Sequence, residues 1–336
     1  MKESVLTILR TSVGVDEYPI FKTLIERNLD FVNFDDREYC WHATPNLLHK
    51  LVRRINRKSL SKNFNNQLLY YIKTLKPSYF IVFKASCISP EVVLAAKNCG
   101  SKTIAIYPDL DPAIYGDEYV LALSEFDFFY HTKPNLEEYF TRVINSRSKL
   151  IGPFFDPKQV KSILPFDPLI GVSFVGHHSP GKEQSLKEFA DQYQGHLTVI
   201  GDRWKASMFY GSNSIVSVRP SLYGVAINEI YQKSICIIGL LMESISAHES
   251  SDEVTARTIL VPCYGGLLLH KKTPSVSRIF NNNDDLLFDD TTDLITKIKK
   301  IESNSEYRAN LASIQQQSSL LAGTNVTNFM NKVLKL

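Results

Sequence analysis

The chain has 336 residues, of which 44% are hydrophobic and 22% are charged, and its net charge is +3. This length favours two domains, and the composition is that of a soluble globular protein. So small a net charge gives no argument for nucleic-acid binding. Five cysteines without paired spacing are typical of reduced thiols in the cytoplasm. The N-terminal apolar stretch is too short for a signal peptide, and the longest apolar run, residues 235–242, is far below the ~20 residues that span a bilayer.

The first half of the chain alternates short apolar runs with amphipathic segments. Strands are predicted at residues 5–9, 30–34, 79–84, 102–107 and 126–132. Helices are predicted between them, including an amphipathic helix over residues 46–60 with basic residues opposite its apolar face. Such alternation predicts right-handed crossovers and a mostly parallel, doubly wound sheet.

A Pro-rich stretch over residues 151–168 interrupts this pattern, which then starts again. The second series of strands is predicted at residues 170–176, 196–201, 235–241 and 266–270. We therefore expect two Rossmann-like domains, residues 1–152 and 169–320, with a linker over residues 153–168. A last helix in residues 321–336 is expected to pack back on the first domain. Ligands of such sheets bind beyond the carboxyl ends of the strands, so the cleft between the domains is the expected site.

The stretch DEVTARTILVPCYGG, residues 252–266, fits a helix over residues 253–263 with one apolar face. Ser250 and Glu253 have the spacing of a capping box, while Pro262 strains the helix near its end. The start of a helix attracts anions, so Arg257 is placed to contact a phosphate and Asp252 to accept sugar hydroxyls. Two interpretations stay open, namely a capped core helix at the surface and a helix end that binds a ligand.

Two loops after predicted strands are weaker candidates. In SFVGHHSPGK, residues 173–182, Gly176 lets a ligand approach the backbone and Lys182 is a charge for a diphosphate. The alternative is a simple strand-to-helix turn with exposed histidines. In YPDLDP, Asp109 and Asp111 are spaced as in some metal sites, but no further oxygen ligands are evident. We favour a loop lining the cleft over a metal site.

Two other features have an ordinary interpretation beside a functional one. Gly14 fits the first strand-to-helix turn, with contact to an acceptor as the alternative. The basic residues of the helix over 46–60 fit a solvated helix face. Their alternative is docking on anionic lipid or on an anionic acceptor.

Together these segments resemble the spore-maturation-type (CgeB-like) glycosyltransferases, a family within the GT-B fold. The resemblance covers roughly residues 75–300. It rests on KPSYFIVFKASCISPEVV and YPDLDP, on the linker IGPFFDP, on VSFVGHHSP and VIGDRW, and most of all on the Arg-Thr motif. In that motif Asp252, Arg257, Thr258, Pro262 and Gly265 fit the family frame. Leu260 stands where the family has a Glu, which in related retaining enzymes holds the ribose of the donor.

The resemblance implies an α/β protein of GT-B fold, with two Rossmann-like domains whose parallel sheets face each other across a cleft. It implies transfer of a sugar from a nucleotide diphosphate sugar to an acceptor hydroxyl, with retention favoured and with no metal or cofactor. The expected catalytic residues are Asp252, Arg257, Asp109 and Asp111. The expected donor-binding residues are Gly176, His177, Lys182, Glu253, Thr255, Thr258, Gly265, Gly266 and Tyr223. Gly14 and Lys84 are expected on the acceptor side.

The expected partners are a nucleotide-sugar donor and a glycan, lipid-linked or other hydroxyl acceptor, as in the biosynthesis of cell-surface polysaccharides. No nucleic acid is expected. The expected location is cytoplasmic, with peripheral association at the inner membrane face through the helix over residues 46–60. Two alternatives remain: a nucleotide-sugar epimerase of the same fold, and a catalytically silent protein that binds nucleotide sugars.

Overall fold

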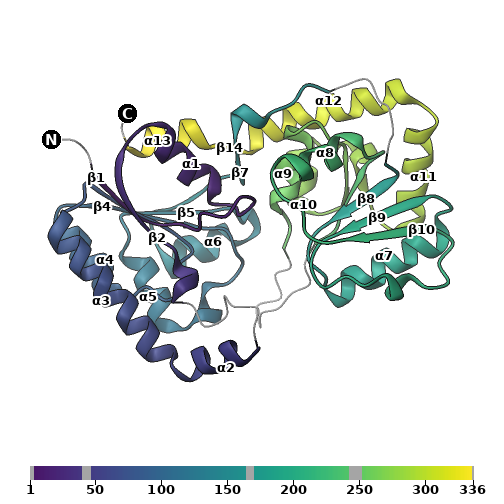
Figure 1. Cartoon of the computed structure of the whole chain (residues 1–336). Helices are drawn as coiled ribbons and strands as arrows, with labels where there is room; N and C mark the ends of the chain where they lie inside the picture. Colours follow the sequence, from purple (N-terminus) through teal and green to yellow (C-terminus); the bar gives the residue numbers. More distant parts are fainter. Residues whose placement is uncertain (1–3, 40–46, 164–169, 242–251, 335–336) are drawn as a thin grey trace. The chain divides into compact units, whose positions relative to one another are not determined.

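The computed structural model describes residues 4–39, 47–163, 170–241 and 252–334 (Figure 1). The chain forms two compact units. The first contains Met1–Ile151 and Val326–Leu336, and the second contains Gly152–Asn325. Each unit has its own sheet and its own hydrophobic core.

The first unit is built on a six-stranded parallel sheet of order β2-β1-β3-β4-β5-β6. Its strands are β1 (Ser4–Ile8), β2 (Asp30–Phe34), β3 (Tyr79–Phe83), β4 (Lys102–Tyr107), β5 (Phe128–His131) and β6 (Ser148–Leu150). All five residues of β3 are buried, as expected for a central parallel strand that is covered on both faces. The order of the strands reverses at β1 and β3, which places the loops after these strands at the usual ligand edge.

Helices cover both faces of this sheet (Figure 1). They are α1 (Tyr18–Glu26), α2 (Leu47–Ile55), α3 (Arg57–Leu75), α4 (Pro90–Asn98), α5 (Asp117–Glu125), the short α6 (Glu137–Tyr139) and α13 (Val326–Leu334). The terminal helix α13 packs against α1, and the Tyr79 hydroxyl donates a hydrogen bond of 3.0 Å to the carbonyl oxygen of Leu334. The C-terminal helix thus belongs to the first unit.

The second unit has a parallel sheet of order β10-β9-β8-β11-β12-β13. Its strands are β8 (Val172–Val175), β9 (His196–Ile200), β10 (Ile215–Arg219), β11 (Ile237–Gly239), β12 (Leu268–Lys271) and β13 (Leu287–Phe288). The order reverses between β8 and β11, so the crevice beyond the ends of these two strands is the place where such a sheet binds a ligand.

The helices of the second unit are α7 (Pro180–Gln192), α8 (Val225–Lys233), α9 (Ala256–Cys263), α10 (Pro274–Ile279), α11 (Thr291–Glu302) and α12 (Ser305–Ala322). α7 packs with α11, and α9 packs with α12. A two-stranded ladder joins β7 (Phe154–Phe155) to β14 (Thr324–Asn325). The start of the expected linker therefore forms part of the second unit.

Two local predictions differ from the structure. The single helix expected over residues 46–60 is two helices, because α2 ends at Ile55 and α3 begins at Arg57 and continues to Leu75. The edge strand β10 was not predicted, since its residues alternate between exposed and half-buried instead of forming a buried run. Within the described ranges, no helix has both the length and the apolar character needed to cross a bilayer.

Candidate functional site

Arg257 holds together the ends of β8 and β11 in the second unit. From the first turn of α9, its guanidinium donates hydrogen bonds of 2.5 Å to the carbonyl oxygen of Val175 and 2.7 Å to that of Leu240. Its charge lies 5.2 Å from the centre of the Phe174 ring. An arginine has five N–H donors, and the described residues offer partners to only two of these. Three donors are therefore left at the point where the strand order reverses.

The electrostatic setting of Arg257 favours a negatively charged ligand. Burial lowers the pKa of its guanidinium, against the opposing effects of Tyr231 and Asp252. The pKa of an arginine is so high that the group stays charged. Asp252 is itself buried, at 8% exposure, and its charge acts on Arg257 in the first turn of α9. A buried cation of this kind gains most from an ionised oxygen of a ligand.

The start of α9 lies beside this guanidinium. The helix begins at Ala256 with Thr255 as its N-cap, and the Thr255 N–H donates to the Thr258 hydroxyl over 3.2 Å. Thr255 and Thr258 form a capping box, in which the buried Thr255 hydroxyl faces the N–H of Thr258, and this hydroxyl has no acceptor for its own hydrogen among the described residues. The first N–H groups of a helix have no intrahelical acceptors and form the positive end of its dipole. The N-terminus of α9 and Arg257 thus present their donors together.

Gly176 allows the close approach of Arg257. A Cβ atom at Gly176 would lie 2.9 Å from Nη1 of Arg257. The carbonyl oxygen of Gly176 accepts a hydrogen bond of 2.8 Å from the Trp204 indole, and its N–H donates to Ile200. This position is therefore glycine because the guanidinium and a neighbouring loop occupy the space of a side chain.

The loops after β8, β9 and β10 are connected through Asp202. Its carboxylate lies 3.6 Å from the imidazole of His177 and accepts a hydrogen bond of 2.7 Å from the Ser221 hydroxyl. Tyr223 follows in the loop after β10 and is 49% exposed. Gly224, next to it, has a φ of 58°, which favours glycine at the start of α8. His177 and Tyr223 thus lie on loops at the carboxyl edge of the sheet, as expected for donor-binding residues.

Lys182, which is expected to neutralise a diphosphate, does not extend into solvent. Its side chain is buried at 7% exposure, and Nζ lies 3.4 Å from the carbonyl oxygen of His177. It lines a cavity of about 390 Å³ together with Lys271 and Asp290. The ammonium group thus lies beneath the loop after β8, and its contribution to diphosphate binding stays a prediction.

Four residues expected at the donor site have structural roles. Glu253 does not cap α9, because its carboxylate accepts a 3.0 Å hydrogen bond from the N–H of Ser275 at the start of α10. Thr258 is fully buried, and its hydroxyl lies 3.3 Å from His270. Gly265 and Gly266 come after α9, at the opposite end of that helix from Thr255. They form the turn into β12, where a Cβ at Gly266 would lie 2.8 Å from the Tyr231 carbonyl oxygen.

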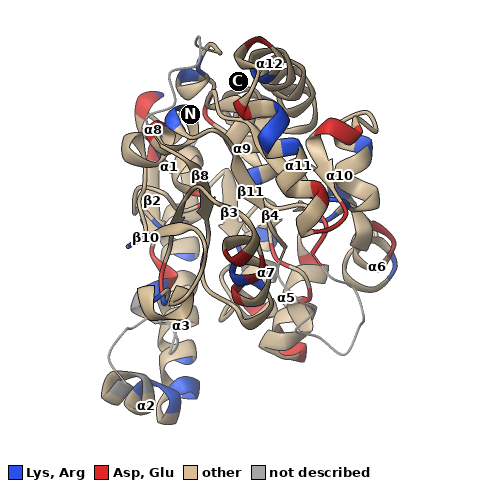
Figure 2. Cartoon of the chain, turned by 90° about the vertical axis from the view of Figure 1, so that its right-hand side faces the viewer, with Lys and Arg blue, Asp and Glu red and all other residues tan. Residues whose placement is uncertain are grey.

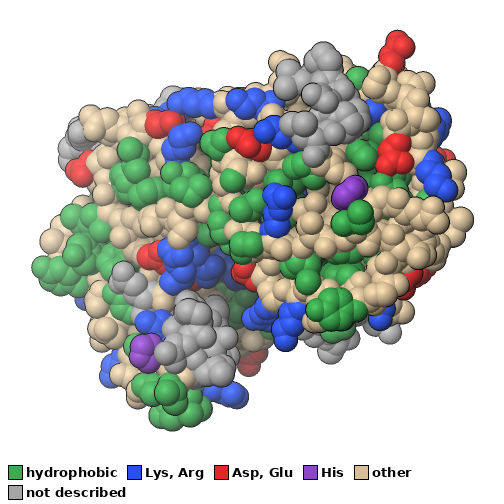
Figure 3. All heavy atoms as spheres, turned by 45° about the vertical axis from the view of Figure 1, so that its right-hand side comes forward, with side chains coloured by type: hydrophobic (Ala, Val, Ile, Leu, Met, Phe, Trp, Pro, Cys, Tyr) green, Lys and Arg blue, Asp and Glu red, His purple; other side chains and the backbone are tan. Residues whose placement is uncertain are grey.

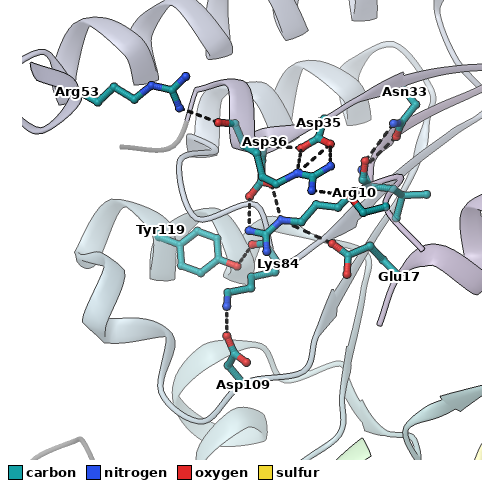
Figure 4. Close-up of polar contacts among 12 residues, drawn as sticks. Arg10, Glu17, Asn33, Asp35, Asp36, Arg53, Lys84, Asp109 and Tyr119 are labelled. Atoms are coloured by element: carbon teal, nitrogen blue, oxygen red, sulfur yellow. Dashed lines mark hydrogen bonds and ion pairs between the residues drawn. The ribbon is translucent and has the colours of Figure 1, made fainter. Parts of the chain in front are cut away.

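In the first unit, Lys84 and Asp109 form an ion pair between the loops after β3 and β4 (Figure 4). Burial lowers the pKa of the Lys84 ammonium, but the charge of Asp109 and the contact with Tyr115 outweigh it and raise the pKa above its ordinary value. Lys84 and Ala85 have φ values of 63° and 31°, which are unfavourable for residues with a side chain. The Tyr119 hydroxyl donates to the carbonyl oxygen of Lys84 and holds this turn. Such strain is typical of functional positions.

Asp111 is held by local hydrogen bonds, and its role as a catalytic base stays a prediction. Its carboxylate accepts hydrogen bonds of 2.9 Å from the Ala113 N–H and 3.1 Å from the Tyr139 hydroxyl, which fix the turn before α5. Asp109 is thus the better candidate of the pair. In the described ranges, no group of three or more His, Cys, Asp or Glu side chains is arranged to hold a metal ion. Gly14, with a φ of 93°, lies in the exposed turn after β1, and its contact with an acceptor stays a prediction.

A second polar cluster in the first unit was not predicted from the sequence. Arg10, just after β1, donates to Asp36 over 2.8 and 3.2 Å and lies 3.7 Å from the Glu17 carboxylate (Figure 4). Arg37 donates to Asp35 close by. In sequence these residues are scattered charges, and only the adjacency of β1 and β2 brings them together. The cluster fixes the loops at the carboxyl edge of the sheet.

Glu17 gives this cluster a pH dependence. Burial raises the pKa of its carboxyl from 4.5 to about 7, against the opposing effects of its backbone hydrogen bond and of Arg10. Between pH 4.5 and about pH 7 the carboxyl of Glu17 loses its proton in the unfolded chain but keeps it in the folded chain. The free energy of unfolding therefore falls as the pH rises, by roughly 3 kcal/mol in all. We expect Glu17→Gln to be more stable than wild type at about pH 8 and equally stable at about pH 4.5.

Urea unfolding at both pH values measures this difference. Glu26→Gln is the matched control, because Glu26 is exposed on α1. A Glu17→Gln variant whose stability relative to wild type is the same at both pH values would show that the carboxyl of Glu17 titrates as an ordinary one.

The chain is similar to known proteins in part of its sequence and in its fold. Residues 182–334 match the glycosyl transferase-like family. No curated protein sequence is significantly similar to the chain. The trehalose-6-phosphate synthase OtsA is 10% identical, with 99% of each chain covered and a TM-score of 0.67. A sucrose-phosphate synthase from Thermosynechococcus elongatus is 12% identical, with 99% of this chain and 98% of that chain covered and a TM-score of 0.64.

A UDP-N-acetylglucosamine 2-epimerase from Listeria monocytogenes, described as putative, is also similar in fold. It is 12% identical, with 100% of this chain and 96% of that chain covered and a TM-score of 0.61. At such low identities these similarities establish the fold alone. The chain has the GT-B fold, with two Rossmann-like units, and most of its second unit lies within a glycosyl transferase-like region.

Proposed function

We propose that this protein is a glycosyltransferase that moves a sugar from a nucleotide diphosphate sugar to an acceptor hydroxyl, with the donor bound by the second unit. The observation that carries the proposal is Arg257, a buried cation at the reversal point of a GT-B sheet, three of whose donors find no acceptor in the part of the chain that the structure describes. The family match of residues 182–334 supports the same activity.

These hydrogen-bond donors match the charge that develops during the reaction. As the bond between sugar and diphosphate breaks, negative charge builds up on the departing diphosphate. Preorganised donors that face this charge lower the barrier, and they act most strongly where water is excluded. Arg257 and the first N–H groups of α9 supply such donors without a metal ion, and the Thr255 hydroxyl supplies one more. We assign to Asp252, which precedes α9 in the chain, the role of holding sugar hydroxyls or of facing the anomeric carbon.

We assign the finer features of the reaction by resemblance. The Arg-Thr motif at Arg257 supports membership of the CgeB-like family, and with it retention of anomeric configuration. Leu260, where that family has Glu, packs against the core of the second unit. We therefore expect weaker recognition of the donor ribose than in enzymes that keep the Glu.

Donor hydrolysis in the absence of an acceptor tests the activity. A transferase releases the nucleoside diphosphate slowly and faster when the right acceptor is added. The epimerase alternative predicts a change in the sugar that needs no acceptor, which proton NMR of the recovered nucleotide sugar detects. A silent binding protein leaves the donor unchanged in both assays.

We further propose peripheral association with anionic membranes through α2. Its apolar side chains are exposed: Leu48 (73%), Leu51 (56%), Val52 (54%) and Ile55 (76%). Figure 3 shows hydrophobic side chains gathered at the lower edge of the view, where α2 lies, and Figure 2 marks Lys and Arg on both α2 and α3. An apolar face beside basic residues is typical of helices that lie in a membrane interface. Wild type should float with anionic vesicles, and a Leu51→Ser/Ile55→Ser variant should not.

A further inference from the structure

A second cavity, of about 690 Å³, lies in the first unit between α3, the loop from β3 to α4, and the start of α5. α3 contributes three cations to its lining, Arg57, Lys58 and Lys62. Lys58, Lys62 and Asn65 recur at the spacing of one helical face. None of these residues belongs to the donor site of the second unit.

Ser89 is the feature that points to a ligand in this cavity. It lines the cavity and is the N-cap of α4, yet its hydroxyl makes no capping hydrogen bond. The residue is only 6% exposed, and its hydroxyl has no hydrogen-bond partner among the described residues. Leaving a buried hydroxyl unpaired costs roughly 1–3 kcal/mol. A bound molecule would supply the missing partner.

The backbone around Ser89 is held in place by Asn65. The Asn65 side-chain oxygen accepts a 2.9 Å hydrogen bond from the Ser89 N–H, and its amide nitrogen donates over 2.9 Å to the carbonyl oxygen of Cys87. The start of α4 is thus fixed against α3. The positive end of the α4 dipole, a hydroxyl and nearby cations form an arrangement that recognises phosphate.

We infer that this cavity binds a phosphate group carried by the acceptor substrate, an inference that rests on the proposed function. The phosphate lies against Lys62 and the Ser89 hydroxyl. Two acidic residues, Glu91 and Glu118, also line the cavity, so it does not suit a ligand that is negative throughout. They accept hydrogen bonds from hydroxyl groups, as a sugar or a glycerol moiety provides.

Two residues that line the cavity also contact Lys84 of the Lys84–Asp109 pair. These residues are Tyr115 and Tyr119. The Tyr115 ring centre lies 5.6 Å from Nζ of Lys84, and the Tyr119 hydroxyl donates to the carbonyl oxygen of the same residue (Figure 4). A phosphate bound near Ser89 therefore anchors an acceptor whose other end extends toward Lys84 and Asp109, where the acceptor hydroxyl is expected.

Isothermal titration of the full chain with inorganic phosphate and with glycerol 3-phosphate tests the inference. We expect Lys62→Ala to weaken binding about tenfold, since one charge-assisted hydrogen bond is lost. Ser89→Ala should weaken binding several-fold without lowering the melting temperature, because its hydroxyl has no hydrogen-bond partner to lose among the described residues. Lys73→Ala is the matched control, since Lys73 is exposed on the same helix, about 16 Å along its axis.

Two sources of the phosphate are distinguished by competition. Displacement of glycerol 3-phosphate by vesicles with phosphatidic acid, but not by neutral vesicles, identifies a lipid headgroup. Tighter binding of a soluble sugar phosphate, without competition by vesicles, identifies a free acceptor. Either result supports the inference provided that Lys62→Ala weakens the binding about tenfold. Absence of binding to all these probes, or binding unchanged in both Lys62→Ala and Ser89→Ala, overturns it.

The same samples separate this inference from the proposed function. Neither substitution lies in the second unit, so binding of a nucleoside diphosphate should stay unchanged in both variants. Loss of nucleotide binding in wild type with phosphate binding intact would count against the proposed donor site and leave the phosphate cavity standing.

Discussion

Replacing Arg257 by alanine should weaken binding of a nucleoside diphosphate about 100-fold. Three donors of the guanidinium have no acceptor among the described residues, and two charge-assisted hydrogen bonds to a diphosphate account for a loss of this size. The variant also leaves the carbonyl oxygens of Val175 and Leu240 without this partner, at a cost of roughly 1–3 kcal/mol in unfolding free energy. Isothermal titration well below the melting temperature measures the affinity.

Two variants separate the loss of a ligand contact from the loss of structure. Arg257→Lys keeps the charge but cannot span both carbonyl groups, so it should retain part of the affinity. Arg278→Ala removes an exposed arginine from α10 and should leave affinity unchanged. A folded Arg257→Ala protein, with a wild-type circular dichroism spectrum, that binds the nucleotide as tightly as wild type would remove Arg257 from the site.

Gly201→Ala should be the most destabilising of the small substitutions near the site. A Cβ at this position would lie 2.0 Å from the carbonyl oxygen of Gly176, and the residue has a φ of 153°. The loop after β8 would have to move, and with it the carbonyl oxygen that accepts the Trp204 hydrogen bond. We expect a loss of about 3 kcal/mol in the free energy of unfolding, together with weaker nucleotide binding.

Gly211→Ala is the matched control for steric overlap. Its φ of 82° also favours glycine, but no atom lies within 4 Å of the added Cβ. It should therefore cost about 1 kcal/mol from backbone strain alone and leave binding intact. Equal losses for the two variants, measured by urea unfolding, would contradict the close packing of the loops after β8 and β9.

Much of the fold was predictable because central parallel strands are buried on both faces. The central strand over residues 102–107 was predicted with the bounds that the structure has, and so was the edge strand over residues 30–34, whose residues are mostly apolar although only Phe34 is buried. The edge strand β10 lacks such a buried run and was missed. The division of residues 46–60 into α2 and α3 was also missed, because neither Pro nor Gly marks the break at Asn56.

The candidate site was predicted in part. Arg257 and Gly176 were selected from sequence, and the structure brings them together because β8 and β11 are neighbours. The sequence could not tell which residues near a motif act as caps. Glu253 and Asp111 have the spacing of site residues, yet each accepts backbone hydrogen bonds at the start of another helical segment. The cluster around Arg10 and the cavity at Ser89 depend on contacts between distant segments and had no signal in the sequence.

The central claim is that the second unit binds the diphosphate of a nucleotide sugar through Arg257 and the start of α9. Thermal unfolding of wild type with a panel of nucleoside diphosphates, their sugar derivatives and the matching monophosphates tests it most directly. We predict stabilisation by at least one diphosphate, by roughly 2.7 kcal/mol at 100 times its Kd, with less stabilisation by the monophosphate. No stabilisation by any diphosphate at millimolar concentration, or equal stabilisation of wild type and Arg257→Ala, would contradict the account.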